Sequence, residues 1–303
     1  MIRLSNISKS FGKMQVLKDI SLEVKNGQIY GLIGYNGVGK TTLMKIICGI
    51  YRPDSGKVWM DQKLLYENAQ RKSDSFFMTE EISAFSQATL DEMRKFYKGY
   101  YSTWSDTTYR ALVEVFHMKD DQKIGQFSKG MQRQAGLILA FSSNVKHLFL
   151  DEAFDGLDFG IRRQVRQMMR CYAKEKNAAI LVSSHNLNEL EELADQIGML
   201  SNGKKIYDDS TQNMKEQFQV CRTYPGSELS KKLSENETAY WLMEQDGMDN
   251  YILPGSMKEI KEKLKDWSQD VMEIRPIRLE EFFQKERNEG KIDWEEIFKM
   301  EDN

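Results

Sequence analysis

The segment Gly34-Tyr35-Asn36-Gly37-Val38-Gly39-Lys40-Thr41 decides which fold this chain can adopt. It matches the pattern G-x-x-x-x-G-K-[ST], whose glycines let several backbone N–H groups approach a phosphate closely. In this pattern the ammonium of Lys40 reaches the β- and γ-phosphates of a nucleotide, and the hydroxyl of Thr41 can bind Mg²⁺. The apolar stretch 28–33 predicts a buried strand before the loop, and residues 41–48 predict a helix whose positive end faces the anion. The residues predicted to contact the nucleotide here are Gly34, Asn36, Gly37, Gly39, Lys40, Thr41 and Thr42.

Composition limits the class of protein. At 303 residues there is room for two domains, and 40% hydrophobic with 29% charged residues is typical of a soluble globular chain. A net charge of −3 argues against a general nucleic-acid-binding surface, which needs a basic excess. No apolar run approaches the roughly 20 residues that span a bilayer, and residues 1–15 lack a signal-peptide pattern. The widely spaced Cys48, Cys171 and Cys221 predict buried thiols in a reducing cytosol.

A second chemical motif lies about 110 residues after Lys40. The stretch 147–152 reads as an apolar strand that ends in two acids, Asp151 and Glu152. Asp151 is placed to hold Mg²⁺, directly or through water, and Glu152 to polarise an attacking water as general base. An acid pair at a strand end is a weak signal alone, but downstream of a phosphate-binding loop it becomes a strong one.

Between these two motifs the apolar period becomes helical, which predicts a helical insert over about 88–142. Thr89 and Glu92 fit a capping box at its start. Near its end, Ser128 is a good N-cap for a further helix, and Gly130 would let a ligand approach the backbone closely. The residues of the first helix predicted to share one core-facing side are Leu90, Met93, Tyr97, Tyr100, Tyr101 and Trp104.

Three other residues stand at positions that suit a ligand. His185 follows the predicted strand 179–183, at the edge where open α/β sheets bind ligands. Asp158 follows a glycine turn and precedes a helix predicted to run to about residue 174. Phe11 lies in a turn beside Gly12 and could stack on an adenine, the alternative being an edge aromatic that packs on the sheet.

In order along about residues 1–210, these motifs resemble the nucleotide-binding subunit of an ATP-binding cassette (ABC) transporter. The segment Ser128-Lys129-Gly130-Met131-Gln132 is similar to the family signature LSGGQ, although Lys129 and Met131 depart from it. The resemblance implies an α/β P-loop fold of ABC type, with a mixed sheet core, an antiparallel subdomain and the helical insert. It also implies an ATPase with ATP and Mg²⁺ as cofactors.

The resemblance assigns roles to the remaining residues. Phe11 matches the family's adenine stacker, and Asp158 matches its D-loop. The family's Q-loop glutamine is not matched, because Glu80 stands at the equivalent position and its charge would alter metal binding. The residues then expected to be catalytic are Lys40, Glu152 and His185. The residues then expected to hold the metal are Thr41, Asp151 and Glu80.

The mechanism that the resemblance implies needs partners. Ser128 and Gly130 of one subunit would cap the γ-phosphate bound at Lys40 of a second copy, so a homodimer would make two composite sites. A separate transmembrane permease subunit would dock near residues 76–85. The expected location is the cytoplasmic face of the cell membrane, as a peripheral subunit.

Residues 211–303 are predicted to form a small α+β accessory domain. A helix is expected over 213–220, followed by short strands and two further helices, and we see no catalytic constellation there. A structural or dimer-stabilising role is the plain interpretation, with a regulatory or ligand-sensing role as the alternative. The stretch 276–283 looks like the C-terminal extension of bacterial exporter ATPases. The chain is most similar to ATPases of Gram-positive peptide exporters, including phenol-soluble modulin exporters, so peptide export is the expected function.

Two other functions compete with this expectation. A soluble ABC ATPase acting on nucleic acid or ribosomes would carry two cassettes with a basic linker or a long coiled coil, and only one cassette without sustained heptads is present. A small-molecule P-loop kinase would not explain Ser128, Asp158 and His185 together. We therefore expect no nucleic-acid partner.

Overall fold

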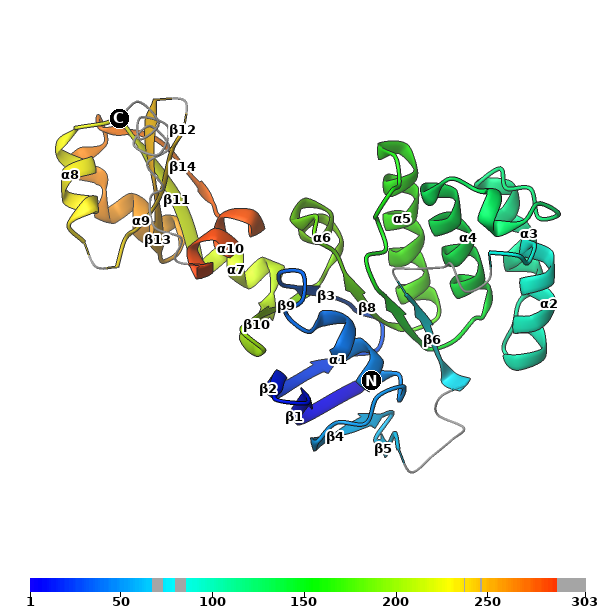
Figure 1. Cartoon of the computed structure of the whole chain (residues 1–303). Coiled ribbons are helices and arrows are strands. Elements are labelled where there is room, and N and C mark those ends of the chain that lie inside the picture. The colour runs from blue at the N-terminus through cyan, green and yellow to red at the C-terminus, as the bar shows by residue number, and fades with distance from the viewer. Residues whose placement is uncertain (67–72, 80–85, 237, 246, 288–303) are drawn as a thin grey trace, which may run out of the picture. The chain divides into compact units, whose positions relative to one another are not determined.

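The computed structural model describes residues 1–66, 73–79, 86–236, 238–245 and 247–287 (Figure 1). Along the chain it divides into two units, residues 1–210 and 211–303. Each unit has its own sheets and its own core, and each is described by itself below.

A mixed six-stranded sheet forms the centre of the first unit. Its strands, in spatial order, are β10 (Lys204–Ser210), β9 (Gln196–Ser201), β3 (Ile29–Ile33), β8 (Ala179–Ser183), β7 (His147–Leu150) and β6 (Ser75–Met78). All neighbours are parallel except β10, which pairs antiparallel with β9. Strands β3, β7 and β8 are buried at every position, as expected for parallel strands covered on both faces. Their carboxyl ends therefore meet at one edge of the sheet.

An antiparallel sheet stands beside this centre. Its strands, in spatial order, are β2 (Met14–Val24), β1 (Ile2–Phe11), β4 (Ser55–Met60) and β5 (Lys63–Leu64). Helix α1 (Lys40–Ile47) joins the two sheets, because its Leu43 and Ile46 belong to one core cluster with Ile2 of β1 and Leu181 of β8. Because α1 begins at Lys40, the end of the phosphate-binding loop is held by packing against both sheets.

The helical insert contains α2 (Leu90–Tyr100), α3 (Asp106–Val115), the short 3₁₀ helix η3 (Ile124–Gln126) and α4 (Lys129–Ser142). Figure 1 shows α2, α3 and α4 side by side. The capping box predicted for Thr89 and Glu92 is confirmed, since both reciprocal bonds are present. The prediction that Tyr100 faces the core is wrong. Its side chain is 55% exposed because α2 ends there and the next residue, Tyr101, turns into the core instead.

Helices α5 (Phe159–Glu175) and α6 (Leu187–Leu193) pack against the central sheet. A hairpin turn at Asn202-Gly203 joins β9 to β10, with φ of 48° and 74° at these two residues. Of the three cysteines, Cys48 and Cys221 are buried, and burial raises the pKa of the Cys221 thiol to about 12. The expectation of a buried thiol is wrong for Cys171, which lies exposed on α5.

The second unit is a four-stranded antiparallel sheet with helices packed on it. Its strands, in spatial order, are β12 (Tyr240–Gln245), β13 (Met248–Pro254), β11 (Phe218–Thr223) and β14 (Val271–Pro276). Its helices are α7 (Thr211–Gln217), α8 (Glu228–Ser234), α9 (Met257–Lys263), the 3₁₀ helix η4 (Lys265–Trp267) and α10 (Leu279–Arg287). Two leucines of α8 and Ile260 of α9 pack with Cys221 and Tyr251 of the sheet in a separate core.

The helix predicted over 213–220 is partly wrong. It ends at Gln217, and Phe218–Thr223 is a strand instead. The reason is tertiary, because β11 pairs with β13 on one side and β14 on the other, so its backbone groups gain ladder partners on both edges. Helix α8, which we did not predict, begins at an N-cap serine, Ser227, whose side chain accepts from the Ser230 N–H.

Candidate active site

Two glycines of the phosphate-binding loop are required by packing as well as by phosphate binding, because neighbouring strands leave no room for a side chain. Gly39 is the N-cap of α1 with φ of 111°, and a Cβ there would lie 2.7 Å from Leu17 Cδ2 of β2. Gly34 has φ of 157°, and its Cβ would lie 2.9 Å from the backbone oxygen of Leu200 in β9. Any side chain at either position would displace the loop from the strands that hold it.

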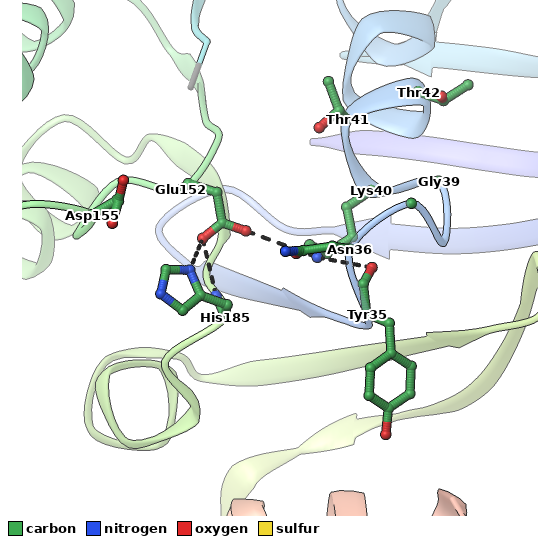
Figure 2. Close-up of a pocket in the computed structure, with 10 residues that line it drawn as sticks. Tyr35, Asn36, Gly39, Lys40, Thr41, Thr42, Glu152, Asp155 and His185 are labelled. Atoms are coloured by element: carbon green, nitrogen blue, oxygen red, sulfur yellow. Dashed lines mark hydrogen bonds and ion pairs between the residues drawn. The ribbon is translucent and has the colours of Figure 1, made fainter. Parts of the chain in front are cut away.

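A pocket of about 470 Å³ opens beside this loop (Figure 2). It lies where the carboxyl ends of β3, β7 and β8 meet, at the edge of the parallel sheet where ligands bind in such folds. The residues that line it are Tyr35, Asn36, Gly37, Gly39, Lys40, Thr41, Thr42, Glu152, Asp155 and His185. Three segments far apart in the sequence, at 35–42, 152–155 and 185, therefore form one site.

Lys40 supplies a positive charge at the wall of the pocket. Its side chain is only 6% exposed, and its Nζ donates to the carbonyl oxygens of Gly34 at 2.6 Å and Tyr35 at 3.2 Å. The carboxylate of Glu152 is 3.8 Å from the same nitrogen. These contacts hold the ammonium against the loop, within the concave surface that the loop forms.

The hydroxyl and carboxylate predicted to bind a metal converge beside the pocket. Thr41 Oγ1 donates to Asp151 Oδ2 at 2.6 Å, although the two residues come from α1 and from the end of β7. Asp151 is 1% exposed. Mg²⁺ takes oxygen ligands and is commonly bound by one or two protein oxygens, with waters and substrate phosphates completing its shell. The oxygens present fit that requirement.

Glu152 is positioned by contacts on both sides of its carboxylate, as Figure 2 shows. Its Oε2 accepts from the backbone N–H of His185 at 3.0 Å and lies 2.8 Å from Nδ1 of the same residue, while Oε1 faces Lys40. The tautomer with a proton on Nδ1 would complete the second bond. The backbone of Glu152 has φ of 49°, a left-handed conformation that costs a non-glycine residue roughly 1 kcal/mol. The end of β7 is thus held in a strained shape that points this carboxylate into the pocket.

The signature and D-loop residues lie next to one another, outside the set of described residues that line the pocket. Ser128 caps α4 by accepting from the Met131 N–H at 3.2 Å, and Asp158 caps α5. A Cβ on Gly130 would collide with the carbonyl oxygen of Gly156, so the start of α4 packs directly on the turn before α5. These groups form a second surface of the same unit.

Two predicted site residues, Phe11 and Glu80, are not among the described residues that line the pocket. Phe11 ends β1, is 43% exposed and packs edge-on against Tyr51 with ring centroids 5.6 Å apart. It is not among the described residues that line the pocket, so its stacking role stays a prediction. Glu80 lies outside the residues that the structure describes.

Two buried residues that we did not predict connect the parts of the site. Arg133 of α4 is 5% exposed, and its Nη1 donates to the carbonyl oxygens of Thr79 at 3.0 Å and Asp151 at 3.3 Å. Ser183, at the end of β8, donates through Oγ to Asp151 Oδ1 at 2.5 Å and accepts from the Glu152 N–H at 3.0 Å. The signal for Ser183 was its place, a polar residue at the carboxyl end of an otherwise apolar strand.

Comparison with known proteins decides the family. The family described as ABC transporter matches residues 17–155. The lantibiotic transport ATP-binding protein SrtF of Streptococcus pyogenes is 31% identical over 223 residues, which cover 72% of this chain and 96% of that protein. The chain belongs to the ABC transporter ATP-binding family. It is an ATP-binding subunit and an ATPase, with the P-loop fold of that family.

Other relatives of this ABC subunit extend the comparison. YtrB, an ABC transporter ATP-binding protein of Bacillus subtilis, is 28% identical over 284 residues, which cover 93% of this chain and 97% of that protein. A match of that length includes most of the second unit. A solved ATP-binding subunit of an ABC transporter has a TM-score of 0.66 and 25% identity, covering 71% of this chain and 92% of that one. The dimeric structure of the bacterial cassette MJ0796, at 19% identity, shares the fold with a TM-score of 0.61, covering 70% of this chain and 99% of that one.

Within the part of the chain that the structure describes, the helices are too short or too polar to cross a bilayer.

We expect Ser183→Ala to lower kcat for ATP hydrolysis by roughly tenfold and to change KM for ATP by less than about twofold. The substitution removes one donor from a buried carboxylate and one acceptor from a backbone N–H, each worth about 1–3 kcal/mol when left unpaired. Steady-state kinetics separate the two parameters. The control is Ser184→Ala, which removes a neighbouring buried hydroxyl whose Oγ accepts from the Asn186 N–H.

Ser183→Thr keeps the hydroxyl and should restore most of the lost kcat. If Ser183→Ala and Ser184→Ala reduce kcat equally, or if the threonine variant restores nothing, Ser183 only supports the fold and does not position Asp151 and Glu152.

Proposed function

We propose that this ATPase drives export of peptides through a separate membrane subunit. The observation that carries the proposal is the combination of the nucleotide pocket with relatives named for lantibiotic transport and for bacitracin transport. SrtF is named for lantibiotic transport, and BcrA of Bacillus licheniformis, 28% identical over 249 residues (81% of this chain, 79% of that protein), is named for bacitracin transport. The cargo class inferred for this chain is amphipathic peptides, of which phenol-soluble modulins are one kind.

In this proposal four residues of the pocket, together with Asp151, act in hydrolysis. The ammonium of Lys40 leaves the carbonyl oxygens of the loop and binds the β- and γ-phosphates. Glu152 accepts a proton from the attacking water, while His185 and Lys40 hold its carboxylate in place. Mg²⁺, held by Thr41 and Asp151, would offset negative charge on the phosphates. The role of Glu80 as a further metal ligand remains part of the proposal.

A homodimer would complete the site. Ser128, Gly130 and Asp158 are not among the described residues that line the pocket of their own chain. They stand at the starts of α4 and α5, where helix N–H groups and the helix dipole suit an anion. We infer that Ser128 and Gly130 cap the γ-phosphate bound at Lys40 of a second copy, and that Asp158 belongs to the same composite nucleotide site. MJ0796 is described as a dimeric cassette, which supports the same arrangement by shared fold alone.

The proposed location is the cytoplasmic face of the membrane, where ATP is available and a permease subunit can be docked. The proposed docking region includes residues 76–79 and the segment beyond them that the structure does not describe. The competing function on nucleic acid or ribosomes has no support among the relatives named above, and the net charge of −3 argues against it.

The cellular test is to replace Lys40 with alanine in the producing cell and to measure amphipathic peptides inside and outside it by mass spectrometry. We expect intracellular peptide to rise several-fold and peptide in the medium to fall, because amphipathic peptides that are not exported partition into the inner leaflet. Lys45→Ala, a lysine in the last turn of the same helix, serves as the control. Unchanged peptide distribution together with defective export of a lipid, sugar or drug would reject peptides as the cargo and leave the ATPase intact.

A further inference from the structure

A second pocket lies within the C-terminal unit, far in sequence from the nucleotide site. It has a volume of about 240 Å³ and sits between α8 and α9, over the end of β13. The residues that line it are Leu229, Lys232, Leu233, Asn236, Thr238, Leu253, Pro254, Ile260, Lys263, Leu264 and Trp267. None of them has a role in the function proposed above.

The floor of this pocket is apolar. Four leucines and one isoleucine of the lining are each at most 8% exposed, and they belong to the core cluster of the unit. The volume is below the roughly 300–1,000 Å³ of pockets for drug-sized ligands. The space therefore suits a short aliphatic chain.

The rim of the pocket is positively charged. Lys232 and Lys263 are its only charged members among the described lining residues, so no described carboxylate lines it. Lys232 Nζ lies 4.2 Å from the centroid of the Trp267 ring, which holds the ammonium at the entrance. Lys232 Nζ also lies 3.7 Å from Oε1 of Glu228, but both side chains are more than half exposed, so this ion pair is weak.

Near Lys263, the other lysine of the rim, the carboxylate of Glu259 already accepts hydrogen bonds from another residue. Glu259 lies on the same helix as Lys263, and its Oε2 accepts from the N–H and the hydroxyl of Ser256 at 2.8 and 2.9 Å in a capping box. Both ammonium groups can therefore donate to an incoming anion without breaking a buried ion pair.

We propose that this pocket binds a small aliphatic carboxylate, with its chain on the leucine floor and its carboxylate between Lys232 and Lys263. Apolar burial supplies the attraction for the chain, and the two ammonium groups select a negative head over a neutral or positive one. The C-terminal unit is then a ligand-binding module of the ATPase subunit. This inference stands independently of the cargo proposed above.

The test is calorimetric titration of the full chain with octanoate, 1-octanol and octyltrimethylammonium, which share the chain and differ in the charge of the head. We expect saturable binding of octanoate with one site per chain, at least about tenfold weaker binding of the alcohol, and no measurable binding of the cation. Equal binding of the three compounds, or no saturable binding of octanoate, would overturn the proposal.

Matched variants locate the site. The double substitution Lys232→Gln and Lys263→Gln should weaken octanoate binding by at least about tenfold. Lys231→Gln and Lys261→Gln, on the same two helices but outside the lining, should leave it within about twofold. All four lysines are exposed, so thermal unfolding of every variant should match the wild type. Equal losses in both pairs would place binding elsewhere and contradict the proposal.

Discussion

The Lys40→Ala variant is expected to bind ATP roughly 100-fold more weakly than the wild type and to lose measurable hydrolysis. Lys40 is the buried cation of the pocket, donating to two carbonyl oxygens of the loop within reach of Glu152. Removing one member of a buried, hydrogen-bonded charge pair costs about 2–5 kcal/mol, and each 1.4 kcal/mol is a factor of ten in affinity. Titration with a fluorescent ATP analogue measures the loss.

Lys45→Ala is the matched control for this variant. Lys45 belongs to the same helix, and its Nζ lies 5.4 Å from the ring centroid of Tyr51. It should bind and hydrolyse ATP within about twofold of the wild type. If Lys40→Ala hydrolyses ATP at the wild-type rate, the phosphate-binding loop has no part in the reaction.

The Glu152→Gln variant is expected to keep ATP bound and to lose at least about 100-fold in turnover. A positioned general base contributes typically 10²–10⁴-fold, and a glutamine side chain cannot accept the proton. The amide keeps nearly the same shape, and its oxygen can still accept from the His185 N–H, so the pocket should stay intact. Single-turnover hydrolysis measured alongside equilibrium ATP binding separates the two effects.

Asp155→Asn tests whether charge alone explains the result. Asp155 lines the same pocket, and this substitution also removes one negative charge there, but its side chain has no contact with Lys40 or His185 in Figure 2. We expect it to retain turnover within about threefold. Full activity of Glu152→Gln, or an equal loss in both variants, would mean that Glu152 is not the base.

Most of the candidate site followed from the sequence because local motifs carry it. The loop at 34–41 and the strand that precedes Asp151 can each be recognised from their own residues, and parallel strands bring their carboxyl ends to one edge of the sheet. Ser183 and Arg133 were not predicted, because their roles depend on contacts with distant residues. The hydrogen-bond partners of Ser183 are at least 31 positions away in the sequence, and those of Arg133 are at least 18 positions away. No local pattern marks such a bond before the fold is known.

The fold was predicted well where periodicity is strong and less well where pairing decides. Residues 179–183 read as a strand and form one with those bounds, since a run of apolar β-formers has no helical face. The prediction failed within residues 218–223, because the helix predicted over 213–220 extends into this strand. The helical pattern of the residues before 218 continues past that position, but pairing with β13 and β14 on the two edges of β11 makes 218–223 a strand.

The most direct test of the account is the mass of Glu152→Gln in solution, measured by light scattering with and without ATP and Mg²⁺. The central claim is that ATP bound at Lys40 is capped by Ser128 and Gly130 of a second copy. We predict that ATP converts the variant from one chain to two, and that adding Ser128→Asp returns it to one chain. Aspartate still caps a helix, so α4 keeps its start while a carboxylate meets the γ-phosphate. A Glu152→Gln chain that stays monomeric when saturated with ATP, or a double variant that dimerises equally well, would contradict the account.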